Sequence, residues 1–310
     1  MKGLLISIAQ RFIYGIIDRV KYENGLLALG ALLSKQQYLL QSNSLQSKRA
    51  LCFHDYGFKI FSQHDEDGLI QFLIKNIKIE NEIFIEFGVE NYVESNTRFL
   101  MMNNNWKGFV MDGSERNMNC LKKRRWYWQY SLTNKAVFIT KENINELLSA
   151  TGFKNIGLLS IDLDGNDAHI FAELDLKQLN PAIIIAEYNA VFGKDRAISV
   201  PYDKEFIRTN KHYSNLYFGA SLPALSYIAG NKGYSLVGCD SGGANAFFVR
   251  NDLLNDVIKA RTVDEAFVVS KSRESRDKNY NLSYLDGDER YEVIKGLDVI
   301  NIKTNTIEKL

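Results

Sequence analysis

The sequence predicts a doubly wound, Rossmann-like α/β domain over residues 55–252, with a mostly parallel sheet that closes on an antiparallel pair. Short apolar runs of the kind that buried parallel strands give alternate with segments whose apolar residues recur at helical spacing. Several strand-like runs end in acidic residues, and two β segments near 234–240 and 245–250 are separated by the glycine-rich SGGA. A helical arm over 1–50 precedes the domain, and a C-terminal extension over 253–310 follows it.

Each element of the domain follows from a local pattern. The continuous apolar runs EIFIEFGV and PAIIIAEYN predict buried strands, and the helical spacing in DEDGLIQFLIKNI predicts a helix. Ser95 or Asn96 is available as the N-cap of the helix after the first strand. In the extension, LDVINIKT fits one more edge strand. In all, helices are predicted at 65–77, 95–105, 115–128, 141–151, 168–174 and 221–233. Besides the antiparallel pair, strands of the domain are predicted at 82–89, 106–114, 135–140, 156–167 and 181–189.

The first residues, MKGLLISIAQRFIYGIIDRV, predict an amphipathic helix. Arg11, Asp18 and other polar residues interrupt the apolar run, so we expect neither a signal peptide nor a membrane span. The arm is expected to pack on the domain or on a second subunit, and the chain is therefore expected to be a homo-oligomer. In the alternative, residues 1–21 contact a membrane surface through four basic side chains, which are Lys2, Arg11, Arg19 and Lys21.

Composition narrows the classes of partner and compartment. The formal net charge of +1 provides no general attraction for nucleic acid. The basic and aromatic segment LKKRRWYWQYS is interpreted as a solvated helix face with core aromatics, so no nucleic-acid partner is predicted. Three scattered cysteines suit a reducing compartment. We therefore expect a cytoplasmic protein, at the inner face of the membrane if residues 1–21 bind lipid.

The stretch IEFGVENYVESNTR joins a strand, a glycine turn and a helix start, which is how a nucleotide-shaped ligand is held. A dinucleotide needs further glycines beside its pyrophosphate, whereas Glu90 and Glu94 would place two anions there. S-adenosylmethionine carries no phosphate, and carboxylates favour its sulfonium and ammonium groups. Asp112 ends the next strand, where a carboxylate accepts hydrogen bonds from ribose hydroxyls. The turn therefore favours S-adenosylmethionine over NAD; an NAD-dependent oxidoreductase and a non-catalytic scaffold are the alternatives.

An ordered set of motifs supports the same cofactor. FSQHDEDGLI, IEFGVENYVESNTRFL, WKGFVMDGS, SIDLDGND, AEYN and NAFFV occur in the order seen in a group of bacterial class I methyltransferases. Over about 60–250 the sequence resembles FkbM-like and related sugar O-methyltransferases, except that common class I enzymes have glycines where Glu90 and Tyr92 stand. The resemblance implies methyl transfer to a sugar hydroxyl of a surface polysaccharide, another glycan or a natural product. The expected cofactor-binding residues are Gln63, Glu86, Gly88, Glu90, Asn96, Met111, Asp112, Ser114 and Asp162.

Acidic and amide side chains also gather where two neighbouring strands end. DLDGND and EYN follow strands that lie side by side in such a sheet, about 4.8 Å apart, so their oxygens can meet around one ion. Hard oxygens without sulfur or imidazole suit Mg²⁺, Ca²⁺ or Mn²⁺. The expected ligands are Asp162, Asp164, Glu187 and Asn189. The alternative is a metal-free site in which a carboxylate serves directly as the base.

The catalytic residues predicted from this arrangement are Asp162, Asp164 and His64. Asp162 is expected to hold the cation, and Asp164 to be a ligand or the base that takes the proton from the acceptor. His64, in SQHDEDG, is the reserve base, although a solvated or packed histidine is the more ordinary role for it.

Overall fold

The computed structural model describes residues 2–47 and 52–310, with the side chains of 21–43 and 52–310. Within these residues a seven-stranded sheet has the order β3-β2-β1-β4-β5-β8-β7. The pairs from β3 to β5 are parallel, and β8 is antiparallel to both β5 and β7. This confirms the predicted doubly wound sheet and its antiparallel pair. The strands are β1 (Asn81–Phe87), β2 (Lys107–Asp112), β3 (Leu132–Ala136), β4 (Ile156–Ile161), β5 (Ile183–Glu187), β7 (Tyr234–Cys239) and β8 (Asn245–Arg250).

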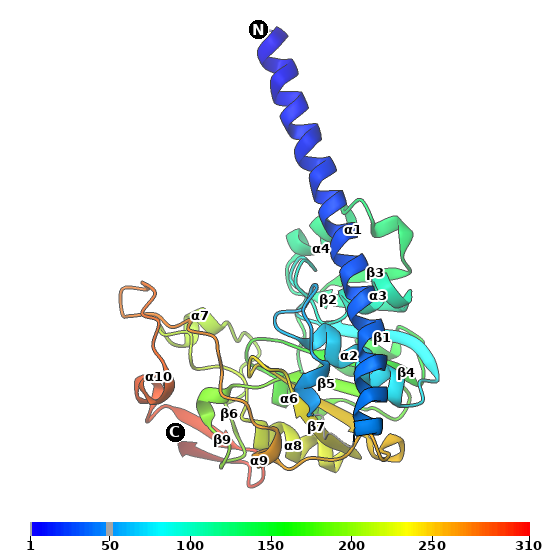
Figure 1. The fold of residues 1–310 in the computed structure, drawn as a ribbon. Helices are drawn as coiled ribbons and strands as arrows, with labels where there is room; N and C mark the ends of the chain where they lie inside the picture. Colours follow the sequence, from blue (N-terminus) through cyan, green and yellow to red (C-terminus); the bar gives the residue numbers. More distant parts are fainter. Residues whose placement is uncertain (1, 48–51) are drawn as a thin grey trace.

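Helices cover both faces of this sheet (Figure 1). Successive strand residues point to opposite faces, so Phe84 packs with residues of α2, α3 and α4, while Ile85 packs with residues of α5, α6 and α8. Both faces are apolar, which explains the continuous apolar runs in the strand sequences. The helices are α2 (Glu66–Asn76), α3 (Arg98–Asn104), α4 (Glu115–Lys122), α5 (Ile144–Ser149), α6 (Asp167–Glu173), α7 (Arg208–Lys211), α8 (Leu222–Asn231), α9 (Val263–Ala266) and α10 (Gly287–Ile294), with 3-10 turns η1 (Phe53–Tyr56), η2 (Tyr127–Gln129), η3 (Ala190–Phe192) and η4 (Asn251–Leu253).

The C-terminal extension forms a second sheet with the segment that follows β5. The order is β10-β9-β6, with β6 (Ile198–Ser199) and β10 (Thr306–Lys309) both antiparallel to β9 (Asp298–Asn301). The strand expected at LDVINIKT therefore exists, but it belongs to this sheet and not to the edge of the main one. A separate apolar cluster, which includes Phe192 and Phe218 from one segment and Ile294 and Val299 from the other, joins the two.

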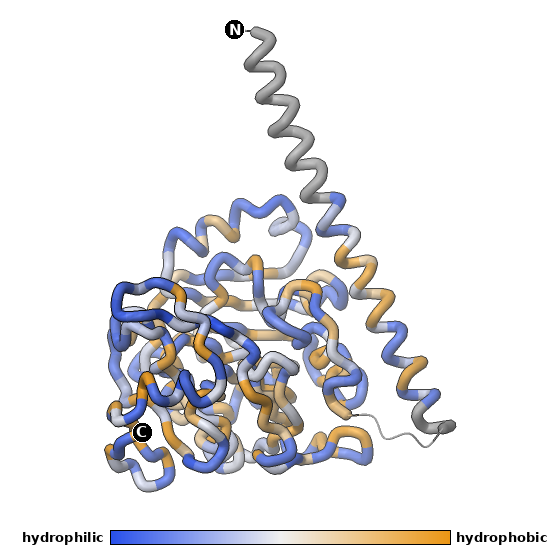
Figure 2. The backbone as a smooth tube through the Cα atoms, turned by 60° about the vertical axis from the view of Figure 1, so that its left-hand side comes forward, coloured by the Kyte–Doolittle hydropathy of each residue, from blue (hydrophilic) through white to orange (hydrophobic). Residues whose placement is uncertain are grey.

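One long helix, α1 (Lys2–Ser47), lies beside α2 and α3 along its C-terminal part (Figure 1). Figure 2 shows apolar and polar residues mixed along its coloured part. The docking is close, since a Cβ at Gly30 would lie 2.4 Å from the Phe99 ring, and Glu23 pairs with Arg98 at 3.0 Å. Lys21 is exposed, whereas the side chains of Lys2, Arg11 and Arg19 lie outside the described residues. No helix in the described part of the chain is long and apolar enough to cross a membrane.

Candidate active site at the carboxyl ends of the strands

A cleft of about 270 Å³ lies beyond the carboxyl ends of β1, β4 and β5. Ligands of doubly wound proteins bind at this edge. Six carboxylates and one guanidinium are among its lining groups, so the cleft favours a cation or a neutral polar ligand over a phosphate. The lining residues are Gln63, Glu86, Gly88, Val89, Glu90, Glu94, Ser95, Asn96, Asp162, Asp164, Glu187, Arg208 and Asn245.

Gly88 lets the turn after β1 pass between the ends of β2 and β4. Its N–H donates to the carbonyl of Met111 at 2.9 Å, and its φ of +68° lies in the left-handed region. A Cβ there would stand 1.6 Å from the carbonyl oxygen of Asp162. Glycine is therefore required at this position for two reasons, which are the left-handed φ and the close contact with the end of β4.

The two positions at which common class I enzymes have further glycines are left-handed as well. Glu90 has a φ of +45° and Tyr92 a φ of +61°. Such a conformation costs a non-glycine residue about 1–2 kcal/mol. Tyr92 offsets that cost by burial, because its ring packs near Trp126 and its hydroxyl lies 2.8 Å from Thr97 Oγ1. Glu90 remains exposed at the cleft.

Glu86 holds the loop that leads into α3. Its carboxylate is buried and accepts hydrogen bonds from the hydroxyls of Ser95 and Thr97 at 2.6 and 2.5 Å and from the Asn96 N–H at 2.9 Å. Burial raises the pKa of Glu86, and these donors act in the opposite direction. Asn96 in turn donates to Ser160 Oγ at 3.1 Å. The N-cap of α3 is Thr97, one residue after the predicted pair.

Asp112 joins the two turns that a cofactor would cross. One of its oxygens accepts from the Glu90 N–H at 2.9 Å, and the other from the Ser114 N–H at 2.8 Å. Ser114 is the N-cap of α4. Asn117 Nδ2 also donates to the second oxygen, Oδ1, at 3.4 Å, so Oδ2 is the oxygen that keeps a lone pair for a ribose hydroxyl. Met111, one of the predicted cofactor-binding residues, has its side chain fully buried in the core on one face of the sheet, so this side chain does not line the cleft.

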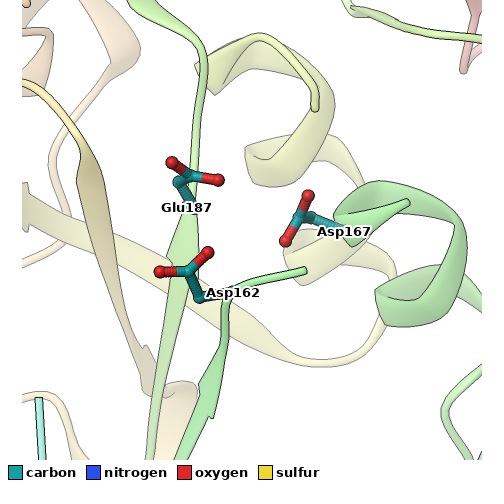
Figure 3. A group of neighbouring side chains, drawn as sticks. All are labelled: Asp162, Asp167 and Glu187. Atoms are coloured by element: carbon teal, nitrogen blue, oxygen red, sulfur yellow. The ribbon is translucent and has the colours of Figure 1, made fainter. Parts of the chain in front are cut away.

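Three carboxylates converge where β4 and β5 end (Figure 3). Asp162 follows β4, Glu187 ends β5 and Asp167 begins α6; one oxygen from each lies within 4.8 Å of the other two. Asp167 is held in place by the N–H groups of Leu163 and Gly165, at 2.7 and 3.0 Å. Desolvation, and then the charges of its acidic neighbours, raise the pKa of Asp162 and of Glu187 well above the ordinary range. Such a cluster either shares protons or holds a cation.

The donor set fits a hard divalent cation. Glu187 Oε2 is buried and has no hydrogen-bond partner among the described residues, so one ligand atom is left uncommitted. Carboxylate oxygens from three elements are the donors that Mg²⁺ and Mn²⁺ take. Asp162, Asp167 and Glu187 would hold the ion. Asp167 was not among the predicted ligands, although its motif DLDGND was singled out.

Two predicted ligands lie outside this cluster. Asp164 has a φ of +53°, is exposed, and pairs with Arg208 Nη1 at 3.0 Å. Asn189 uses its whole amide within the fold: Oδ1 accepts from the Val191 N–H at 3.0 Å, and Nδ2 donates to the carbonyls of Leu216 and Phe218, each at 2.9 Å. The predicted ligand set is therefore corrected at Asn189, which caps η3 and anchors the segment after β5.

The reserve base also lies elsewhere. His64 is half-buried and packs on the loop after β7, where a Cβ at Gly242 would meet its ring at 2.2 Å. It is not among the residues that line the cleft, whereas its exposed neighbour Gln63 is. His169 is buried, and its Nε2 lies 2.7 Å from the carbonyl of Val200. Neither His64 nor His169 lines the cleft, so carboxylates are the proton acceptors that its lining offers.

Arg208 and Asn245 are two cleft residues that sequence reasoning missed. Arg208 lies with its guanidinium 3.7 Å from the centre of the Phe218 ring and beside Asp164. Asn245 begins β8 opposite Glu187; its Nδ2 donates to Glu66 at 2.8 Å, and its buried Oδ1 has no partner in the described part of the chain. NAFFV was the signal available for Asn245; Arg208 lies in a polar connection with no recognisable pattern.

Glu66 makes the stability of the fold depend on pH. Burial and the nearby Asp240 raise the pKa of Glu66 from 4.5 to about 7, against the Asn245 and His64 hydrogen bonds that lower it. The native state therefore retains a proton that the unfolded state has lost, so this stabilisation is complete below pH 4.5 and disappears as the pH rises through 7.

We expect the free energy of unfolding to fall by up to about 3 kcal/mol between pH 5 and pH 8, measured by urea denaturation. Burial also raises the pKa of Asp67, to about 6, so Asp67 likewise makes the fold less stable as the pH rises. Glu66→Gln should flatten this dependence, and Glu80→Gln, at an exposed position, should not. An identical slope in wild type and Glu66→Gln would contradict the assignment.

The comparisons with known proteins give structural similarity alone. The sequence matches no family model and no curated protein. The structure is similar to the N-terminal domain of EvdMO1 with SAH bound (TM-score 0.40, 11% identity, covering 69% of this chain and 94% of that one). It is also similar to a putative O-methyltransferase from Klebsiella pneumoniae (TM-score 0.39, 12% identity, covering 58% of this chain and 78% of that one). A third similar structure is the O-methyltransferase from Bacillus cereus in complex with SAH (TM-score 0.36, 14% identity, covering 54% of this chain and 72% of that one). At these scores and identities the similarity assigns no activity to this chain.

Proposed function

We propose that this chain is an S-adenosylmethionine-dependent O-methyltransferase whose acceptor is a sugar hydroxyl of a surface polysaccharide or another glycan. The observation that carries the proposal is the acidic cleft beyond β1, β4 and β5, with Glu90 and Glu94 on its first turn. A pyrophosphate would be repelled there, whereas a sulfonium and an ammonium group would be attracted. The motif resemblance found in the sequence supports the same cofactor.

The acceptor hydroxyl requires help, because its pKa is far too high for a good nucleophile at neutral pH. A bound Mg²⁺ or Mn²⁺ would lower that pKa and neutralise the developing alkoxide. Asp162, Asp167 and Glu187 would hold it, and a sugar diol is a suitable bidentate ligand. In the metal-free alternative, Glu187 Oε2, which has no described partner, would instead take the hydroxyl proton.

Methyl transfer is an in-line displacement in which the acceptor oxygen bonds to the methyl carbon and the carbon–sulfur bond breaks. S-adenosylhomocysteine leaves as a neutral thioether, and the proton of the hydroxyl passes to the carboxylate cluster. The chain therefore contributes mainly position and electrostatics. Assaying transfer of labelled methyl to a panel of sugar nucleotides and glycan extracts tests the activity; absence of transfer to every acceptor, despite cofactor binding, would count against the sugar assignment.

Asp112 should be the residue on which cofactor binding depends most. Calorimetry should show S-adenosylhomocysteine binding to the wild-type chain, and Asp112→Ala should weaken it by about tenfold to a hundredfold, since hydrogen bonds to a charged group contribute about 1.5–3 kcal/mol. Asp175→Ala, an exposed aspartate whose carboxylate accepts from the Lys177 N–H, is the matched control. A thermal scan of both variants separates lost binding from lost fold.

Two alternatives make different predictions in the same titration. An oxidoreductase would bind NADH tightly and would not respond to S-adenosylhomocysteine. A non-catalytic scaffold would bind neither ligand, and its cleft would be filled by side chains. The open cleft of about 270 Å³ and its uncommitted carboxylate favour an active site over a scaffold.

We propose that α1 mediates self-association. Its described part exposes large apolar side chains, and such a surface would reduce the solubility of the chain if no partner covered it. Leu32→Glu with Leu39→Glu should lower the mass measured by light scattering from that of an oligomer to that of a monomer, while Lys35→Glu should not. A monomeric wild type would contradict the idea, and flotation with anionic vesicles tests the alternative that residues 1–21 bind a membrane. The exposed residues are Tyr22, Leu29, Leu32, Tyr38 and Leu39.

A further inference from the structure

A second cleft, of about 470 Å³, lies between the segment after β5 and the C-terminal extension. Its size suits a small-molecule ligand. Phe192, Phe267 and Tyr291 provide apolar and aromatic walls, and Arg290 of α10 lies among its lining residues. Nothing in the chemistry assigned to the first cleft uses these residues.

Arg290 is the unusual member of this cleft. Its side chain belongs to a residue that is only 6% exposed, and its Nε is buried without a hydrogen-bond partner. It makes no hydrogen bond or ion pair with any residue that the structure describes. An unpaired buried guanidinium is costly, so its retention indicates an anion that is brought by a ligand.

The acidic residues nearest in charge to Arg290 form their ion pairs with other arginines. Asp286 pairs with Arg273 at 2.8 Å, and Glu274 lies 3.5 Å from Arg276 and 3.9 Å from Arg208. Arg196, the other arginine of the cleft, is satisfied by Glu308 at 2.7 Å. Arg208 and Arg273 add positive potential at Arg290, while Asp286 and Glu274 add negative potential there without pairing with it.

Two exposed aspartates also line the second cleft, but neither neutralises Arg290. Asp195 pairs with no described cation, and neither it nor Asp288 forms an ion pair with Arg290 within the described part of the chain. Their exposed carboxylates remain hydrated and screened, whereas the guanidinium is buried. The buried end of the cleft therefore favours a negative group.

The second cleft is close to the first along the chain. Glu187 lines the first cleft and Ala190 the second, and three residues span at most about 11 Å. Arg208 lines the first cleft and acts electrostatically on Arg290. The two clefts are thus neighbours along the chain, and Arg208 of the first acts on the charge of Arg290 in the second.

We propose that the second cleft binds the anionic group of the acceptor, a phosphate or a carboxylate, through Arg290, while the sugar hydroxyl to be methylated lies at Asp162 and Glu187. This assignment rests on the proposed function. It gives the C-terminal extension a role in selecting the acceptor, because α10 carries Arg290 and other residues of the extension, Phe267 and Leu310 among them, also line the cleft.

The test is calorimetric titration of the full chain with glucose 1-phosphate, with glucuronate and with neutral glucose. We expect one of the two anions to bind and glucose not to bind; the anion that binds identifies phosphate or carboxylate. Arg290→Gln should weaken this binding about tenfold to a hundredfold, Arg290→Lys should weaken it less, and Arg261→Gln, at an exposed arginine outside the cleft, should not change it.

Thermal scans and an S-adenosylhomocysteine titration accompany these measurements. Without ligand, Arg290→Gln should melt no lower than wild type, because the change removes an unpaired buried charge. A large fall in melting temperature, equal anion binding by Arg290→Gln, or no anion binding at all would overturn the inference. If S-adenosylhomocysteine binds while no anion does, the second site is wrong and the proposed function stands; if anions bind and S-adenosylhomocysteine does not, the proposed function fails and the acceptor role with it.

Discussion

Asp162→Asn should reduce methyl transfer by about a hundredfold to ten-thousandfold, while the affinity for S-adenosylhomocysteine stays within a few fold. The substitution keeps the shape of the side chain but removes one carboxylate from the three that converge at the ends of β4 and β5. Without it the cluster holds a cation less tightly and is a weaker sink for the hydroxyl proton. Initial rates with labelled S-adenosylmethionine, beside a calorimetric titration, measure the two effects separately.

Asp164→Asn is the matched control, because Asp164 lies two residues away but is exposed and pairs with Arg208. An exposed ion pair contributes about 0–1 kcal/mol, so the rate should change little. A loss as large as that of Asp162→Asn would restore Asp164 as the base, as the sequence suggested. Activity that vanishes with EDTA and returns with Mn²⁺ supports the cation, and activity that survives exhaustive chelation assigns the same carboxylates to a metal-free base.

The sheet could be predicted because its two buried faces impose a simple pattern on the sequence. Strands such as β4 (Ile156–Ile161) are buried at every position and apolar at all but Ser160, and the SGGA turn separates β7 and β8 as expected. Boundaries were less certain: β3 covers 132–136, where 135–140 was predicted. LTNKA has mixed burial on an edge strand, so no continuous apolar run marks it.

The candidate site could be predicted only as far as strand ends determine it. Asp162 and Glu187 follow directly from the ends of β4 and β5, which parallel pairing must bring together. The sequence could not rank Asp167 above Asp164, because the backbone turns between them. Asp164, with a φ of +53°, lines the cleft and pairs with Arg208 but does not join the carboxylate cluster. Arg208 comes from a segment that reaches the site through tertiary packing, which leaves no local signal.

Gly88→Ala should be the most destabilising single substitution at the site. The added Cβ would stand 1.6 Å from the carbonyl oxygen of Asp162, and the two residues directly follow β1 and β4, which the sheet holds in register. The left-handed φ of +68° adds about 1–2 kcal/mol, and relieving the overlap adds about 1–3 kcal/mol. We expect the free energy of unfolding, measured by urea denaturation, to fall by about 2–5 kcal/mol.

Gly152→Ala separates the two contributions, because Gly152 has a nearly identical φ of +67° but no described atom outside its chain neighbours within 4 Å of an added Cβ. It should lose only about 1–2 kcal/mol. The difference between the two losses of unfolding free energy measures the contact between the first turn and the end of β4. Only Gly88→Ala should also lose S-adenosylhomocysteine binding, because Glu86 and Glu90 move with that turn. Equal losses in the two variants would mean that the turn can withdraw from Asp162 at little cost, and that the cofactor side and the carboxylate side of the cleft are not rigidly joined.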